Sequence, residues 1–400
     1  MAFAAKIIAA IWQKPNQPQT TLKGSFCKAK AMVVFMNYNT KEVDPNMIVE
    51  TTLKESDLKF YSVRNDPFDV YGLYDYRNGD QFVRMPLEVS KTVSSSVDFL
   101  CRQTAGGRVR FCTDSTYVAF KVVMPQIRYM SHMPLSGSGG FDLFIDSESG
   151  YENCFGGSIR PDFNARGGYE GIIRFAKREK RYITVNFPSY DSVSALYIGL
   201  QNDAMLDHGL KYRNEKPVVF YGSSITQGAC ASRPGNNYIN ILSRRLNMDF
   251  VNLGFSGSAK AEPEMLDYLA SLDMSVFVSD YDHNAPNVAH LEATHFKLYE
   301  KIREKHPDIP YIMASRPDFG IENKAKDSIE RLNVVYNSFR RAKEAGDKNV
   351  YFLSGESMFI GRDRELCTIE GTHPTDIGFL KMANAFEDVF VRVISETKVF

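Results

Sequence analysis

The chain is 400 residues long, which is comfortable for two domains of ordinary size. Its composition, 44% hydrophobic and 24% charged, is that of a globular protein that buries sizeable cores. The 48 basic and 48 acidic residues give a net charge of zero, which argues against a protein that binds nucleic acid through its overall charge. No apolar run approaches the ~18 residues of a membrane-spanning helix, so we expect no membrane span.

The six cysteines lie far apart and form no C-x-x-C pair, so a zinc ribbon is not expected. A chain of this length does not need a disulfide framework for its stability. The sequence therefore predicts neither a structural metal site of this kind nor a network of disulfides.

The N-terminal residues 1–46 show little periodicity and are predicted to be an extension. Within them, Met1–Trp12 has one lysine followed by a short apolar run. A secretory signal has an apolar stretch of ~7–15 residues and a small-residue cleavage site, which this segment does not match. The sequence thus slightly favours a cytoplasmic location over export.

Residues 47–205 are predicted to form an all-β domain, a sandwich or jelly roll. Short segments rich in Val, Ile, Phe and Tyr are separated by Gly, Asp, Asn and Ser clusters, without helical segments between them. The polar stretch 206–216 is predicted to be a linker. The expected strands are Phe82–Val89, Val97–Gln103, Arg108–Cys112, Tyr117–Met124, Phe141–Ile145, Gly171–Phe175, Tyr182–Phe187 and Ala195–Leu200.

Residues 217–400 follow a different pattern, in which strands and helices alternate. This alternation predicts a parallel sheet of five strands with helices on both faces. Ligands of such sheets bind at the carboxyl ends of the strands, so the loops after the strands are where a site is expected. The expected strands are Val218–Tyr221, Phe250–Leu253, Val276–Ser279, Tyr311–Ala314 and Val350–Leu353; the expected helices are Asn237–Leu246, Met265–Ala270, Val288–His306, Ser328–Lys343 and Phe379–Val393.

The first two of these loops contain groups that suit acyl transfer. The turn Gly222–Gly228 places serines beside glycine, where a hydroxyl can be exposed, although the G-x-S-x-G elbow is absent. Gly254 ends the second strand, and its N–H can donate to a developing oxyanion. Taken singly, each feature is more typical of an ordinary turn.

The loop after the third strand contains Asp280, Asp282, His283 and Asn284. The Asn284 carboxamide can act as a second oxyanion donor. The two aspartates and the histidine are the alternative, a metal site. Hard cations need more oxygen ligands and zinc needs partners that the sequence does not identify, so we predict no metal ion.

Glu370 and His373 have the arrangement of a general base and its orienting partner. The histidine lies just before a predicted helix, and the carboxylate lies three residues earlier. The alternative is a surface histidine at a helix start. The other histidines without such a setting are interpreted as structural or solvated, namely His132, His208, His290, His295 and His306.

In this order, the four blocks resemble those of the SGNH (GDSL-type) hydrolases, named after a Ser, a Gly, an Asn and a His. Gly222-Ser223-Ser224-Ile225 is similar to the Gly-Asp-Ser-Leu block and aligns Ser224 with the nucleophile. The other three blocks supply Gly254, Asn284 and His373. The resemblance extends over residues 218–393 and implies a three-layer α/β, flavodoxin-like hydrolase domain.

Two blocks depart from the family pattern. The third reads Asp282-His283-Asn284-Ala285 instead of Gly-x-Asn-Asp, and the fourth has Glu370 in place of aspartate. Glutamate is one methylene longer. Either Glu370 or a backbone carbonyl, in a dyad-like site, would then orient His373.

The resemblance implies a serine esterase that needs no metal or organic cofactor. In this interpretation Ser224 is the nucleophile, His373 the general base and Glu370 its partner. Ser224, Gly254 and Asn284 form the oxyanion hole. The stretch 221–235 is similar to bacterial members with a β-sandwich ahead of the hydrolase domain, as in some carbohydrate acetyl esterases.

The loops are small and polar, which favours a short acyl group such as acetyl on a sugar. We therefore expect a small-molecule or oligosaccharide acyl ester as the partner, and an oligomer is compatible with the sequence. Arg233 either binds a carboxylate or sugar hydroxyl of the substrate or is a solvated loop charge. The alternatives are a lipase, thioesterase or lysophospholipase, and a carbohydrate-binding protein that has lost catalysis.

Overall fold

The computed structural model describes residues 53–149, 153–317 and 325–400. The predicted N-terminal extension 1–46, with its segment Met1–Trp12, lies outside these residues. The described residues all belong to one compact unit, Ile48–Phe400. Contacts between its two sheet systems can therefore be described.

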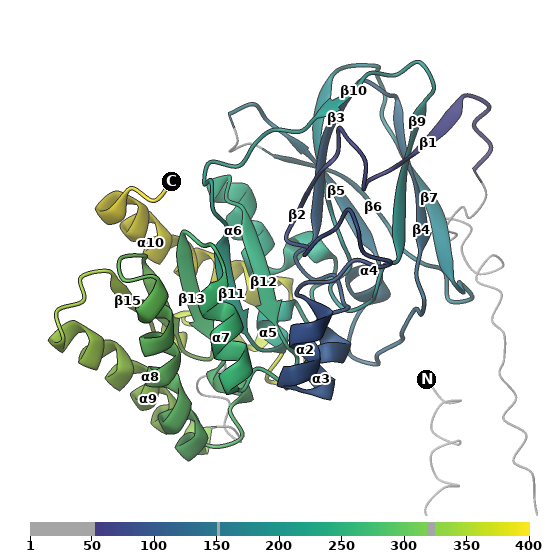
Figure 1. Cartoon of the computed structure of the whole chain (residues 1–400). Coiled ribbons are helices and arrows are strands. Elements are labelled where there is room, and N and C mark those ends of the chain that lie inside the picture. Colours follow the sequence, from purple (N-terminus) through teal and green to yellow (C-terminus); the bar gives the residue numbers. More distant parts are fainter. Residues whose placement is uncertain (1–52, 150–152, 318–324) are drawn as a thin grey trace, which may run out of the picture. The chain divides into compact units, whose positions relative to one another are not determined.

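The first half of the described chain is a sandwich of two antiparallel sheets (Figure 1). One sheet has the order β1-β9-β4-β7, and the other has the order β10-β3-β8-β5-β6, with β2 also paired to β3. The strands are β1 (Leu58–Ser62), β2 (Asp69–Tyr71), β3 (Arg108–Thr113), β4 (Tyr117–Val123), β5 (Phe141–Asp146), β6 (Cys154–Ile159), β7 (Gly168–Arg174), β8 (Arg181–Asn186), β9 (Ala195–Gln201) and β10 (Leu206–His208).

Alternate residues of both sheets meet in one apolar core, which is the pattern of a sandwich. Phe120 of β4, Ile183 of β8 and Ile198 of β9 are fully buried in it. This confirms the all-β prediction for this half. The predicted linker 206–216 contains β10, which pairs antiparallel with β3.

The second half is a five-stranded parallel sheet with the order β12-β11-β13-β14-β15, which confirms the predicted α/β fold. The order reverses around β11, because β12 lies on one side of it and β13 on the other. A ligand site is expected at the carboxyl ends of the strands at such a switch point. The strands are β11 (Val218–Gly222), β12 (Phe250–Gly254), β13 (Val276–Asp280), β14 (Tyr311–Ala314) and β15 (Val350–Leu353).

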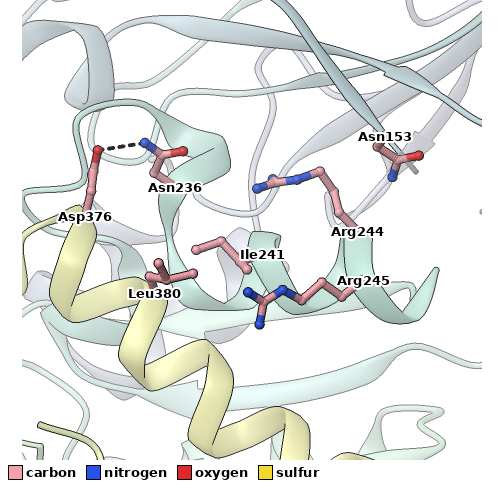
Figure 2. Close-up of a pocket in the computed structure, with 7 residues that line it drawn as sticks. All are labelled: Asn153, Asn236, Ile241, Arg244, Arg245, Asp376 and Leu380. Atoms are coloured by element: carbon pink, nitrogen blue, oxygen red, sulfur yellow. Dashed lines mark hydrogen bonds between the residues drawn. The ribbon is translucent and has the colours of Figure 1, made fainter. Parts of the chain in front are cut away.

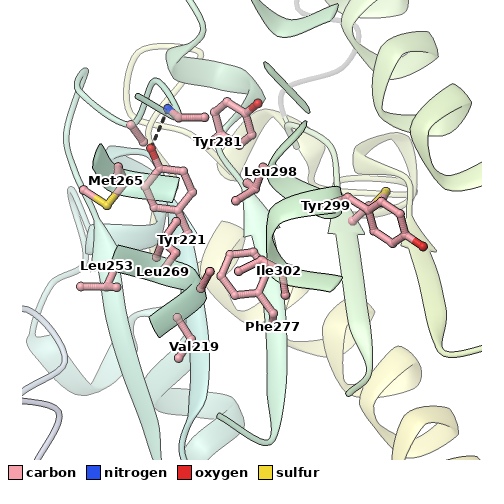
Figure 3. Close-up of a cluster of buried hydrophobic side chains, with 14 of the residues drawn as sticks. Val219, Tyr221, Leu253, Met265, Leu269, Phe277, Tyr281, Leu298, Tyr299 and Ile302 are labelled. Atoms are coloured by element: carbon pink, nitrogen blue, oxygen red, sulfur yellow. Dashed lines mark hydrogen bonds between the residues drawn. The ribbon is translucent and has the colours of Figure 1, made fainter. Parts of the chain in front are cut away.

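Helices cover both faces of this sheet, and alternate strand residues point into two separate cores. Figure 3 shows the first core, in which Val219 and Tyr221 of β11 lie beside Met265 and Leu269. In the second core Phe220 packs against the opposite helices. The first face carries α7 (Pro263–Ser271), α8 (Val288–Lys305) and α9 (Ala325–Glu344); the second carries α6 (Tyr238–Leu246) and α10 (Asp376–Thr397).

Two predicted strands of the first half, Phe82–Val89 and Val97–Gln103, are wrong. The structure instead has α2 (Leu87–Val93) and α3 (Ser95–Leu100). Ser94 begins α3, because its side chain accepts the N–H of Val97 at 3.2 Å, and an N-cap of this kind favours a helix. The buried faces of both helices join the core of the second half beside α7 (Figure 1).

Arg84 is a buried polar link between the two halves. It is 1% exposed, and its guanidinium donates hydrogen bonds to four backbone carbonyls. Two of these belong to the first half and two to the end of β12, so one side chain joins both sheet systems. The acceptors are Leu100 (2.7 Å), Gln103 (2.8 Å), Asn252 (3.0 Å) and Gly254 (2.6 Å).

None of the helices within the described ranges has the length and apolar character needed to cross a membrane. The cysteines in these ranges are free thiols, namely Cys101, Cys112, Cys154, Cys230 and Cys367.

We predict that Arg84→Met lowers the free energy of unfolding by about 3–5 kcal/mol, because buried carbonyls lose their charged donor. Urea denaturation of the wild type and the variant measures this change. Arg77→Met is the control, since Arg77 lies at the surface with a solvent-exposed partner, Asp66. Equal stability of the Arg84 variant and the wild type would contradict the role of Arg84 as a link.

Candidate active site

The turn after β11 holds the predicted nucleophile in a fixed position. Ser223 caps the short helix α5 (Ser224–Gln227), because its side chain accepts the N–H of Ile225 at 3.1 Å. Ser224 is therefore the first helical residue, and it is 7% exposed. A side chain at Gly222 is excluded, since a Cβ there would lie 2.1 Å from Thr226 Oγ1 and 2.5 Å from Asp280 O.

The structure brings Ser224, His373 and Glu370 into one hydrogen-bonded chain, although 149 residues separate the serine from the histidine. Ser224 Oγ lies 2.9 Å from His373 Nε2. Glu370 Oε1 lies 2.8 Å from His373 Nδ1 and also accepts the backbone N–H of His373 at 3.0 Å. This geometry fits a neutral imidazole with its proton on Nδ1, whose Nε2 accepts the serine proton.

The electrostatic surroundings keep His373 in its basic form. Burial lowers the pKa of His373 below its ordinary value of 6.5, and the charge of Glu370 opposes this shift. The imidazole of His132, with its ring centroid 5.6 Å from that of His373, lowers the pKa further. At neutral pH the imidazole is therefore mainly unprotonated and can accept a proton.

Gly254, predicted as an oxyanion donor, has a structural position instead. Its N–H donates to Asn252 Oδ1 at 2.9 Å and is no longer available to a substrate. A Cβ at this position would lie 2.3 Å from the backbone nitrogen of Gln227. The glycine is thus required by the close approach of α5 to β12, and its predicted role as an oxyanion donor is wrong.

The loop that follows Gly254 contains another glycine, Gly257, which the sequence analysis missed. It has a φ of +67°, and its Cβ side faces open space. Its N–H has no hydrogen-bond partner among the described residues, whereas the N–H groups of Gly254, Phe255, Ser256, Ser258 and Ala259 are all bonded. The signal in the sequence that could have identified Gly257 is the Ser256-Gly257 pair shortly after the end of β12.

Asn284 lies beside this loop, in a 3₁₀ turn after β13 (Asp282–Asn284). Its Oδ1 accepts the N–H of Ala259 at 3.3 Å. This bond fixes the orientation of the carboxamide and leaves Nδ2 as a donor for a ligand. The predicted Asn284 is therefore close to the Gly257 loop.

Arg233, predicted to contact the substrate, is held by protein groups. Its guanidinium lies 3.9 Å from the ring centroid of Phe155 and 5.3 Å from that of Phe144. Its Nη1 donates to the buried carboxylate of Asp142 at 3.3 Å. The structure thus uses Arg233 to attach the loop after the nucleophile to the sandwich, and contact with a substrate stays a prediction.

Asp376, the first residue of α10, also holds this loop. Its carboxylate accepts the N–H of Ser232 at 2.9 Å and Nδ2 of Asn236 at 2.7 Å, the bond drawn in Figure 2. Asp376 and Asn236 also border a pocket of about 390 Å³. Its two arginines, Arg244 and Arg245, are hydrogen-bonded to the protein, and the pocket contains no member of the Ser224 chain.

The alternative metal site at Asp280 and Asp282 is not favoured by the geometry. Asp280 accepts hydrogen bonds from Thr226 Oγ1 and the Tyr238 hydroxyl, and Asp282 accepts the N–H of Arg316. Burial, together with the charge of Asp282, raises the pKa of Asp280 to about 8. Through these hydrogen bonds, the carboxyl groups of Asp280 and Asp282 stabilise the loops around the site.

Another group of metal-ligand types surrounds His373. Ligand atoms of His132, Cys230 and His373 lie within 4.8 Å of one another. Burial raises the pKa of the Cys230 thiol to about 12, so the thiol is protonated, and both ring nitrogens of His373 are already hydrogen-bonded. A metal ion here would have to displace Ser224 or Glu370, so we assign no metal to this cluster.

Two family models match the chain in the order of its two halves. Residues 215–391 match the GDSL-like lipase/acylhydrolase family, and residues 58–206 match the N-terminus of the SGNH hydrolase-type esterases. The chain is an SGNH-type esterase. No curated protein matches this esterase in sequence.

Solved structures with both halves resemble the esterase along most of its length. A protein described as a GDSL-like lipase from Bacteroides ovatus is 27% identical, with a TM-score of 0.75, covering 84% of this chain and 98% of its own. The salicylyl-acyltransferase SsfX3 of a tetracycline biosynthetic pathway is 19% identical, with a TM-score of 0.68 and coverages of 85% and 98%. A family two carbohydrate esterase from Clostridium thermocellum is 12% identical, with a TM-score of 0.56 and coverages of 83% and 99%. The similarity to the last two structures shows a shared fold.

We predict that Glu370→Gln reduces kcat/KM by about 10²–10⁴-fold, because the imidazolium formed during proton transfer loses its counter-charge. Since the carboxylate raises the pKa of His373, its removal moves the acidic limb of the pH profile to lower pH. A pH series of kcat/KM with p-nitrophenyl acetate measures both effects. Glu365→Gln, a nearby exposed carboxylate, is the control. If Glu370→Gln leaves both kcat/KM and the acidic limb of the pH profile unchanged, Glu370 takes no part in the proton transfer through His373.

Proposed function

We propose that this esterase hydrolyses short acyl esters, in particular acetyl esters of carbohydrates, through an acyl-enzyme on Ser224. The observation that carries the proposal is the hydrogen-bonded chain from Ser224 Oγ through His373 to Glu370. A serine hydroxyl is a weak nucleophile alone, and an adjacent base that is itself oriented by a third group activates it.

In the first half of the reaction His373 Nε2 takes the Ser224 proton as Oγ attacks the ester carbonyl. The bond to the alcohol oxygen then breaks, and His373 returns the proton to the leaving alcohol. In the second half a water molecule gives a proton to His373 and attacks the acyl carbonyl. Ser224 leaves with that proton, and the acid is released.

Three donors converge on the position of the developing oxyanion in this proposal: the N–H of Ser224, the N–H of Gly257 and Nδ2 of Asn284. The assignment of Gly257 is supported by elimination, since the neighbouring N–H groups of its loop are bonded to the protein. Fixed donors of this kind stabilise the tetrahedral intermediate without reorganisation. Gly257 replaces Gly254 of the sequence prediction.

The choice of a short acyl group on a sugar is supported by the polar loops around Ser224. Two structures with the same fold are named as a family two carbohydrate esterase and as an acetyl xylan esterase, the latter from Butyrivibrio proteoclasticus. In this proposal residues 217–400 form the catalytic domain and residues 47–205 the β-sandwich domain, joined by residues 206–216. Tyr190 of the sandwich, whose hydroxyl donates to Ser224 O at 3.2 Å, borders the site.

We predict that Ser224→Ala abolishes hydrolysis of p-nitrophenyl acetate, while Ser223→Ala retains a measurable part. The Ser223 side chain caps α5, so its loss costs about 0.5–2 kcal/mol of stability but leaves the nucleophile in place. The wild type is expected to cleave the octanoate ester poorly. The reverse pattern of the two variants would show that Ser223 is the nucleophile, and efficient octanoate cleavage would favour a lipase.

We predict that Asn284→Asp lowers kcat by about 10²–10³-fold with little change in KM, because the donor to the oxyanion is lost. Aspartate retains the oxygen that accepts the N–H of Ala259, so the loop keeps its anchor. Steady-state kinetics on p-nitrophenyl acetate measure the effect. Asn287→Asp, at the cap of α8, is the control outside the site. Wild-type kcat in Asn284→Asp would remove Asn284 from the oxyanion hole.

A further inference from the structure

A pocket of about 440 Å³ lies where α3 and loops of the sandwich half meet the Gly257 loop. Two of its lining groups belong to the surroundings of the nucleophile. The hydroxyl of Tyr190 donates to Ser224 O, and Ser256 and Ser258 flank Gly257 in the chain. The volume is in the range of sites for whole small ligands, so it exceeds the need of an acetyl group. The pocket therefore adjoins the backbone around Ser224 and has room for a group larger than acetyl.

Arg128 is the charged residue of this pocket, and its side chain lacks the partner that a guanidinium usually has. Its Nη1 is buried without a hydrogen-bond partner, and no carboxylate of the described residues forms a salt bridge with it. A buried donor that is left unpaired costs free energy, so such groups are rare unless a ligand satisfies them.

The guanidinium of Arg128 is held in place by Phe99 of α3. The centre of the guanidinium lies 4.3 Å from the ring centroid, which is the geometry of a cation–π contact. Phe99 is 47% exposed and lines the same pocket. A planar cation stacked on an aromatic ring presents its N–H edge in a fixed direction, which suits recognition of a carboxylate.

The carboxyl group of Asp191, which contacts the backbone of Arg128, carries only a partial negative charge near neutral pH. Asp191 accepts the backbone N–H of Arg128 at 3.2 Å, and burial raises the pKa of this carboxyl to about 7. Asp191 therefore offsets the positive charge of Arg128 only in part. Among the residues that line the pocket, Arg128 is the charged group that a ligand would meet.

We propose that this pocket binds a carboxylate of the ester substrate through Arg128, so that the esterase prefers acetyl esters of acidic sugars over those of neutral sugars. The inference rests on the proposed function and adds the substrate class. The pocket offers both surfaces that a sugar acid requires. Phe99, Leu100 and Met130 supply apolar contacts for the ring face, and the serine hydroxyls of α3 and of the Gly257 loop supply polar contacts for its hydroxyl groups.

The test compares kcat/KM on acetylated glucuronic acid with kcat/KM on acetylated glucose. We expect the wild type to prefer the acidic sugar by about tenfold or more, and Arg128→Gln to reduce this ratio by about 10- to 100-fold, as for the loss of a charged hydrogen bond. Arg128→Lys keeps the positive charge but lacks the paired N–H donors of the guanidinium. Its ratio should lie between those of the wild type and Arg128→Gln. Arg102→Gln is the matched control, because Arg102 follows α3 but is paired with Asp98 outside the pocket.

A second pair of substrates tells which side of the ester carries the carboxylate. p-Nitrophenyl hemisuccinate and its neutral methyl ester place the charge on the acyl group. A preference confined to this pair would overturn the assignment to acidic sugars, because the carboxylate would then lie on the acyl side of the ester. A ratio near one in the wild type for both pairs, or equal ratios in the wild type and Arg128→Gln, overturns the proposal.

Binding to the unmodified protein keeps the test independent of the folding of any variant. Free glucuronate should inhibit p-nitrophenyl acetate hydrolysis more strongly than glucose does, and equal inhibition overturns the inference. If the wild type hydrolyses no ester, the proposed function fails. The pocket is then still tested by the shift in melting temperature, which glucuronate should raise more than glucose and which equal shifts would contradict.

Discussion

The close packing of α5 against the end of β12 is the contact on which the active site depends. The absence of a side chain at Gly254 lets the backbone of α5 approach β12 directly. Asn252 closes the same contact, because its Nδ2 donates to Thr226 O at 2.7 Å while its Oδ1 accepts the Gly254 N–H. The helix that carries Ser224 and the loop that carries Gly257 are thus fixed to one short piece of strand.

The sandwich half takes part in this arrangement directly. Arg84 donates to the carbonyls of Asn252 and Gly254, so the end of β12 is held from both sides. Gln103 accepts a hydrogen bond from the side chain of Gln227, the last residue of α5. These contacts explain why α2 and α3 belong to the core of the second half although they precede it by more than a hundred residues in sequence.

The two sheet systems could be predicted because each has a simple period. Strands of the sandwich alternate between core and surface, and the second half alternates between strands and helices. The region of α2 and α3 was misread since its Val, Phe and Leu residues also suit strands. Its helical character depends on the Ser94 cap and on burial against α7, a contact that the local sequence does not reveal.

For the site, too, some residues could be predicted from the sequence and others could not. Ser224, Glu370 and His373 were predicted because the chemistry requires their residue types, and the structure brings the three side chains together. Gly254 was assigned the wrong role and Arg233 was left with two alternatives, since an arginine or a glycine has many uses, and its partners decide among them. Phe155 and Asp142 contact Arg233, and the backbone of Gln227 lies against Gly254. Each of these partners is distant in sequence from the residue that it contacts.

The glutamate in place of the family's aspartate is compatible with a working relay because of its position. Three residues before His373, its Oε1 meets both the Nδ1 and the backbone N–H of the histidine, so the longer side chain is held at two points. Burial, together with the charge of Glu370, raises the pKa of the neighbouring Cys230 thiol to about 12. At neutral pH the thiol therefore stays protonated beside a basic imidazole, and the hydroxyl of Ser224, which is hydrogen-bonded to Nε2, is the group from which that imidazole can take a proton.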